Sequence, residues 1–143
     1  MQTIRWLSGF VAAALATAAL SSVFQTQYNL TRIAALDQPM PFTLRLVTMM
    51  QDLLHFAPTY AIIVAAGFLI AFAVAGSLSA VFPRQRGWLY PAAGFVAVLS
   101  ALLIMSAMLP VTAISAARSG LGMFFLSLFG AVGAWLHASI TAR

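Results

Sequence analysis

The sequence contains no cysteine, no lysine and no glutamate, and few charged residues of any kind. Without cysteine the chain cannot form disulfides, thiolate metal sites or thiol redox centres. Seven arginines and two aspartates make up 6% of the 143 residues, whereas a soluble domain of this length carries about 25% charged residues. So few charges cannot hydrate the surface of a globular protein. The composition therefore excludes an ordinary soluble domain.

The sequence is instead rich in long apolar stretches. Hydrophobic residues make up 63% of the chain, with a mean hydropathy of +1.01, and a membrane-spanning helix needs about 20 predominantly apolar residues. Four stretches meet this requirement, and none of them contains a charged residue: about 6–24, 58–82, 89–110 and 121–140. The sequence predicts an all-α integral membrane protein, a four-transmembrane-helix bundle that forms a single transmembrane domain over residues 1–143.

The first stretch has two interpretations. The tripeptide Ala16-Thr17-Ala18 resembles the cleavage site of a secretory signal peptide. However, the apolar run over 6–24 is longer than the core of about 7–15 residues typical of such signals. The length favours an uncleaved first helix, and removal of residues 1–18 stays open as the alternative.

The arginines indicate how the helices are oriented. Short cytoplasmic loops of membrane proteins carry an excess of arginine and lysine. A cytoplasmic N-terminus places four arginines on the cytoplasmic side: Arg5, Arg84, Arg86 and Arg143. The opposite side then holds three arginines and both aspartates: Arg32, Arg45, Arg118, Asp37 and Asp52. We therefore expect a multi-pass protein of the cell inner membrane with both termini cytoplasmic.

The connection over residues 25–57 is the one long segment between the predicted spans. Pro39 and Pro41 interrupt any helix there, because proline lacks an amide hydrogen and restricts the residue before it. Over residues 42–56 the apolar residues recur with helical spacing, with Leu46 and Met50 on one ridge. The pattern predicts an additional amphipathic helix that lies in the outer interface or folds over the mouth of the bundle.

The polar side of this amphipathic helix holds the best candidates for chemistry. Arg45, Asp52 and His55 share one stripe, and a carboxylate beside an imidazole can serve as a general acid or base. No nucleophile motif or second carboxylate lies near them in the sequence. A solvated face that keeps the helix at the interface is therefore the favoured interpretation, and these three residues are only weak catalytic candidates. We expect no metal site and no cofactor.

Each predicted span has small residues on one face, which allow helix backbones to approach closely. The second and fourth spans also carry bulky residues, Phe68, Phe72, Phe124 and Phe125 among them, which we expect to face lipid or a partner. His137, near the end of the fourth span, is expected to extend its ring toward the headgroups.

Three functions remain compatible with the sequence. The spans lack Asp, Glu, Lys and Arg, which commonly mark proton or ion pathways, and the scattered arginines form no nucleic-acid footprint. We expect a protein without catalytic machinery, surrounded by membrane lipids, that serves as an accessory or scaffold subunit of a membrane complex or as a homo-oligomer. The alternatives are a binder of lipid, quinone or another apolar molecule between the helices, and an outer-face enzyme or transporter that uses Asp52, His55 and Arg45.

Overall fold

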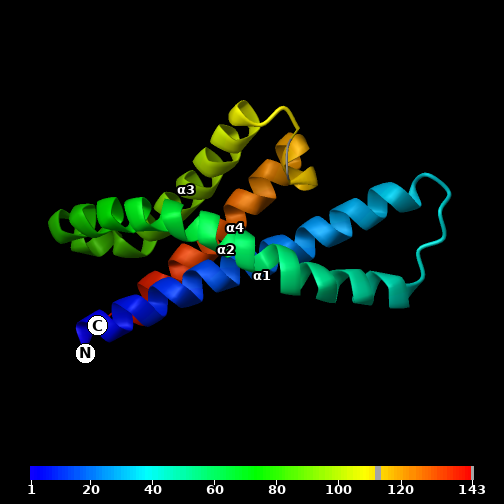
Figure 1. The fold of residues 1–143 in the computed structure, drawn as a ribbon. Coiled ribbons are helices and arrows are strands. Elements are labelled where there is room, and N and C mark those ends of the chain that lie inside the picture. Colours follow the sequence, from blue (N-terminus) through cyan, green and yellow to red (C-terminus); the bar gives the residue numbers. More distant parts are fainter. Residues whose placement is uncertain (112–113, 143) are drawn as a thin grey trace.

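The computed structural model describes residues 1–111 and 114–142 and is helical over most of them (Figure 1). The long helices are α1 (Gln2–Ala34), α2 (Phe42–Val81), α3 (Arg86–Met108) and α4 (Gly120–Thr141), and the short 3-10 helices η1 (Pro83–Gln85) and η2 (Ser115–Arg118) precede α3 and α4. Four segments are long and apolar enough to cross a membrane: α1, α2, η1 together with α3, and α4. This agrees with the prediction of an all-helical, multi-pass membrane protein.

Each helix packs against two others, in the order α1, α2, α3, α4 and back to α1. The N-terminus and the C-terminal end of α4 lie side by side (Figure 1). There Arg5 Nη2 donates to the carbonyl oxygens of Ile140, at 2.9 Å, and Ala142, at 2.8 Å. At the other end of α4, Tyr28 Oη donates to Ser119 Oγ over 3.0 Å. Helix α4 therefore runs antiparallel to α1, and the ends of α1 and α2 that their connection joins project beyond α4.

Residues 42–56 do not form a helix of their own, contrary to the sequence prediction. They are the first part of α2, which continues through Pro58 to Val81. Proline removes one backbone hydrogen bond and costs about 3 kcal/mol inside a helix, but contacts with α1 hold α2 on both sides of this position. Thr26 binds Asp52 before the proline, and Phe10 packs edge-on against Phe72 after it.

Glycines mark the places where two helix backbones approach most closely. A Cβ atom on Gly130 of α4 would lie 2.6 Å from the carbonyl oxygen of Gly94 on α3, and one on Gly133 would lie 2.7 Å from that of Ala13 on α1. Both separations are shorter than van der Waals contact. The small residues of α4 therefore pack α3 on one side and α1 on the other.

The bulky residues of α2 differ from the sequence prediction. Phe68 and Phe72 are 0% and 2% exposed and stack on each other inside the bundle, with their ring centroids 4.7 Å apart. The expectation that they face lipid or a partner is wrong. Phe124 and Phe125 of α4 do lie on the exposed surface. Helix α2 is apolar on nearly every side, so its sequence does not mark which side faces the core.

Candidate functional site

The predicted polar stripe lies on the first part of α2, and its residues do not converge. The Oδ2 atom of Asp52 is 2.5 Å from the hydroxyl of Thr26 on α1. Arg45 Nη1 donates to Gln27 Oε1, also on α1, over 3.1 Å. His55 is exposed, and its Nδ1 lies 2.9 Å from the carbonyl oxygen of Gln51 in its own helix. Two of the three candidates thus tie α2 to α1, and the third contacts its own backbone.

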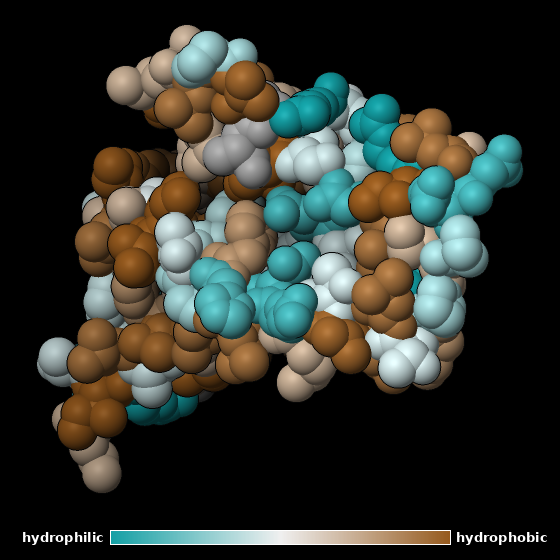
Figure 2. Space-filling view, turned by 45° about the vertical axis from the view of Figure 1, so that its right-hand side comes forward, coloured by the Kyte–Doolittle hydropathy of each residue, from teal (hydrophilic) through white to brown (hydrophobic). Residues whose placement is uncertain are grey.

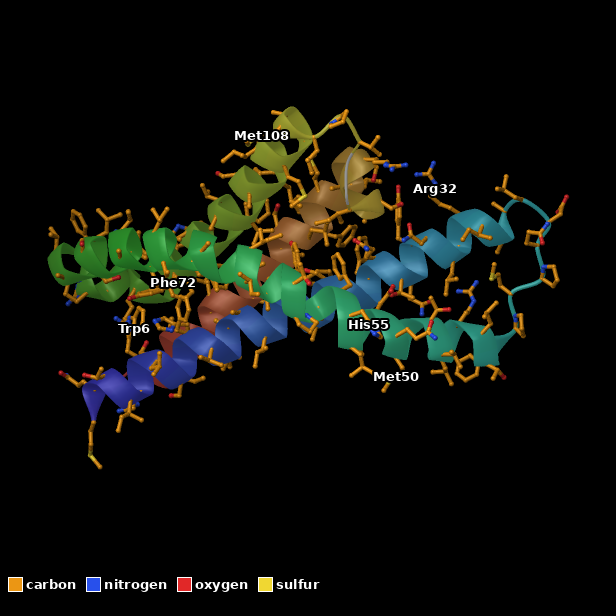
Figure 3. The ribbon with its side chains drawn as sticks, viewed as in Figure 1. Trp6, Arg32, Met50, His55, Phe72 and Met108 are labelled. Atoms are coloured by element: carbon orange, nitrogen blue, oxygen red, sulfur yellow. The ribbon has the colours of Figure 1, made fainter. Side chains whose placement is uncertain are left out.

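The polar and apolar sides of residues 42–56 do not face the directions expected for a separate helix lying in the interface. The polar atoms of Arg45 and Asp52 meet α1, whereas Leu46 and Met50 of the predicted apolar ridge are 43% and 56% exposed and Leu54, beside that ridge, is 68% exposed. Figure 3 shows Met50 and His55 on this part of α2, far from Trp6 and Phe72. The stripe is therefore a contact between helices, and the surface that the segment presents outward is largely apolar.

Figure 2 turns the α1–α2 connection toward the viewer. Hydrophilic residues gather in a band across this end, with hydrophobic residues around them. An end with this mixture suits the boundary between lipid tails and headgroups, where polar and apolar surfaces both find partners.

A buried polar face of α1, which the sequence reasoning missed, lies next to the stripe. Ser21, Ser22, Gln25 and Thr26 are all buried, as is Tyr60 of α2. The hydroxyls of Ser21 and Tyr60 lie close to each other, and the side-chain oxygens of Ser22 and Gln25 have no hydrogen-bond partner among the described residues. Buried polar atoms without a protein partner usually bind ordered water. The polar run that starts at Ser21 is the signal in the sequence for this face, and its residues from Gln25 onward continue α1 to Ala34.

His137 lies in the core at the opposite end of the bundle, so the expectation that it reaches toward the headgroups is wrong. It is 0% exposed. Its ring stacks on Phe72, with centroids 4.4 Å apart, and contacts Tyr90 and Trp6 at 5.3 and 5.7 Å. Aromatic rings from α1, α2 and α3 therefore surround the imidazole. Beyond this level α1 and α4 continue and bind each other through Arg5.

An apolar groove follows the outer surface between α2 and α3. Its volume is about 650 Å³. Small residues from both helices line it: Ala66, Gly67 and Ala71 of α2, and Ala93, Ala97, Ser100 and Ala101 of α3. Larger aliphatic side chains line it too, including Ile70, Val74, Val96 and Ile104. The groove can accept an apolar shape, and no charged residue lines it.

Comparison with known proteins does not indicate a function for this chain, so the function has to be inferred from the geometry described above. No family model, curated protein or solved structure matches the chain. Within the described residues, no group of three or more histidine, cysteine, aspartate or glutamate side chains is placed to hold a metal ion.

Proposed function

We propose that this chain is a membrane assembly protein without catalytic machinery, which packs a transmembrane helix of a partner into the α2–α3 groove. The partner helix belongs to a second copy of the chain or to another subunit of a complex. The observation that carries the proposal is the groove itself, an apolar hollow with small residues on both walls.

Small residues favour a helix as the occupant. Lipid tails are as apolar as leucine, so helices associate in a membrane through close packing and not through removal of apolar surface from water. Gly67 and Ala71 on one wall, and Ala93, Ala97 and Ala101 on the other, repeat at intervals of four residues, which is one helical turn. Such walls let the backbone of a partner helix approach closely.

The polar stripe gives less support to the enzyme or transporter hypothesis. An acid–base pair has to reach a bound substrate directly or through one water molecule. Asp52 and Arg45 are engaged with α1, and neither they nor His55 line the groove. These contacts favour a structural role for all three.

The same proposal includes the location and orientation expected from the sequence. We propose the inner membrane with both termini cytoplasmic. Arg5, Arg84 and Arg86 lie at the end of the bundle that holds both termini, whereas the aspartates belong to the opposite end; Arg143 lies outside the described residues. We also propose that residues 42–56 lie in the outer interface as the amphipathic start of α2, with Met50 and Leu54 toward lipid.

A bound lipid, quinone or other apolar molecule is the second candidate occupant. The volume and apolar lining of the groove favour it as well, since apolar ligands bind in concave, mainly hydrophobic sites. Cross-linking distinguishes this function from helix docking. If a small ligand occupies the groove, no second protein lies close enough to be cross-linked to it.

Cysteine cross-linking in native membranes tests the proposal. The chain has no cysteine of its own, so Ala66→Cys and Ser100→Cys each introduce a single reactive thiol at the groove. A benzophenone maleimide attached to these thiols and activated by light inserts into C–H bonds of any neighbouring protein. It should give adducts at about 30 kDa if a second copy of the 15.2 kDa chain docks, or at another mass if a different subunit does. The matched controls are Leu15→Cys on α1 and Val132→Cys on α4, which are exposed and belong to helices that do not line the groove.

Two results would refute helix docking. The first is equal cross-linking at the groove and control positions, which indicates random collision. The second is no adduct at the groove together with a lipid or quinone that is retained through purification, detected by native mass spectrometry, and lost in Ala66→Trp. That outcome would establish the second candidate function.

A further inference from the structure

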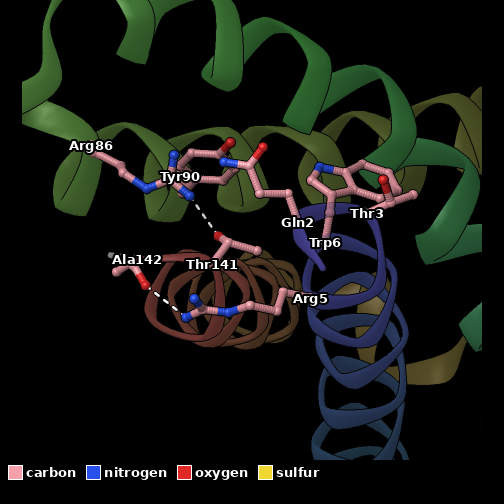
Figure 4. A pocket seen from close by; sticks show the side chains of 8 residues that line it. All are labelled: Gln2, Thr3, Arg5, Trp6, Arg86, Tyr90, Thr141 and Ala142. Atoms are coloured by element: carbon pink, nitrogen blue, oxygen red, sulfur yellow. Dashed lines mark hydrogen bonds between the residues drawn. The ribbon is translucent and has the colours of Figure 1, made fainter.

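A separate cavity opens at the end of the bundle that holds both chain termini. Its volume is about 690 Å³, and it receives residues from α1, α3 and α4 (Figure 4). Arg5 and Trp6 come from α1, Arg86 and Tyr90 from α3, and Thr141 from α4. Helices distant in the sequence thus bring two guanidinium groups and two aromatic rings to one opening.

Both guanidinium groups are held in place by the end of α4. Arg5 Nη2 donates to the carbonyl oxygens of Ile140 and Ala142. Arg86 Nη2 donates to Thr141 Oγ1 over 2.5 Å, and its guanidinium carbon lies 4.8 Å from the centroid of the Tyr90 ring. Side chains that are already ordered lose less entropy when they bind a ligand.

The two arginines keep donors that these contacts do not use. Each guanidinium has five N–H groups, and the bonds described above involve only the Nη2 atom of each residue. Among the described residues, the Nε atom of Arg86 is buried without a hydrogen-bond partner. Buried donors are nearly always paired with an acceptor, and Arg86 lines the cavity, which favours an acceptor as its ligand.

The charged side chains that line the cavity are both arginines. No carboxylate side chain lines it, and the two aspartates of the chain, Asp37 and Asp52, belong to the opposite end of the bundle. Arg84 in the neighbouring η1 adds a third positive charge nearby. The cavity therefore attracts an anion and has no acidic side chain of its own to neutralise it.

The aromatic residues place this cavity at the level of the lipid headgroups. Trp6, Trp88 and Trp135 belong to this half of the bundle and are partly exposed. Tryptophan concentrates at membrane–water interfaces, where its ring contacts both apolar and polar surroundings. The anions that are abundant at this level are the phosphates of phospholipids.

We propose that this cavity binds the phosphodiester group of an anionic phospholipid, with Arg5 and Arg86 as its ligands. Guanidinium groups match the geometry of phosphate oxygens and bind them through paired hydrogen bonds. Basic pockets between transmembrane helices bind anionic headgroups in this way. Trp6 and Tyr90 provide an apolar wall for the adjoining glycerol. The site is independent of the α2–α3 groove.

Lipid binding to the purified, delipidated full-length chain tests this site. We expect native mass spectrometry to show tighter binding of phosphatidylglycerol than of phosphatidylcholine. Arg86→Gln and Arg5→Gln should each weaken phosphatidylglycerol binding by about tenfold or more, because each removes charged hydrogen bonds. The matched control Arg84→Gln removes one positive charge from the adjacent turn but does not line the cavity, so it should change binding by less than about threefold at physiological salt.

The binding measurements distinguish a lipid phosphate site from nonspecific lipid binding and from a site for soluble phosphate. Arg86→Lys keeps the positive charge but loses the planar pair of N–H donors that binds two phosphate oxygens at once. It should therefore bind phosphatidylglycerol more tightly than Arg86→Gln but less tightly than the unmodified chain. Circular dichroism confirms that each variant keeps its helix content. Equal binding of the two lipids, or an equal loss in Arg84→Gln, would overturn the site. Inorganic phosphate that competes with phosphatidylglycerol at equal concentration would show a soluble phosphate site instead of a lipid site.

Discussion

The crossing of α3 and α4 at Gly94 and Gly130 allows a prediction of both sign and size. In Gly94→Ala, the new Cβ would overlap the carbonyl oxygen of Gly130 and the Cβ of Ala134, and it would lie 3.1 Å from the carbonyl carbon of Gly130. The helices must separate by about 0.5–1 Å, which forfeits a quarter to a half of each affected contact energy. Overpacking of this kind costs about 1–3 kcal/mol, and the gain in helix propensity returns at most about 1 kcal/mol.

Gly87 in the same helix provides the matched control. A Cβ at Gly87 has no heavy atom within 4 Å, so Gly87→Ala should leave stability unchanged or raise it by up to about 1 kcal/mol. Unfolding in mixed micelles of dodecyl maltoside and sodium dodecyl sulfate, followed by circular dichroism, measures both variants. If Gly94→Ala proves as stable as Gly87→Ala, the close crossing of α3 and α4 is incorrect.

Two more contacts can be tested with the same unfolding assay. In a double-mutant cycle, Thr26→Val and Asp52→Ala should show a coupling energy of about 1–2 kcal/mol, because a hydrogen bond to a charged group joins them. Asp52→Ala and Ser77→Ala should instead be additive, since Ser77 bonds only its own helix. Phe72→Ala should cost about 3–5 kcal/mol by leaving a cavity in the core. Leu69→Ala in the exposed face should cost less than about 1 kcal/mol, because lipid fills the space of the lost side chain; equal costs would contradict the assigned orientation of α2.

Some features of the site followed from the sequence and others did not. The arginines indicate orientation, but no periodicity brings Arg5 and Arg86 together, because they are 81 positions apart in the sequence. They meet because both bind the end of α4. The stripe of Arg45, Asp52 and His55 was found by helical spacing. Its contact with α1 exists because α1 continues as a helix to Ala34, beyond the apolar run that ends at Phe24, and so brings Thr26 and Gln27 beside α2.

Composition and apolar runs alone identify four stretches that are apolar enough to cross a membrane and locate most of these spans. Scarce charge and long apolar runs settle this, because water and hydrocarbon differ strongly as solvents for them. The packing of the helices against one another turns Phe68, Phe72 and His137 inward and Met50 and Leu54 outward, and it carries α2 through Pro58. Lipid tails and a protein core are almost equally apolar. Hydropathy therefore cannot distinguish the two sides of a spanning helix, and the fit between helices makes the choice.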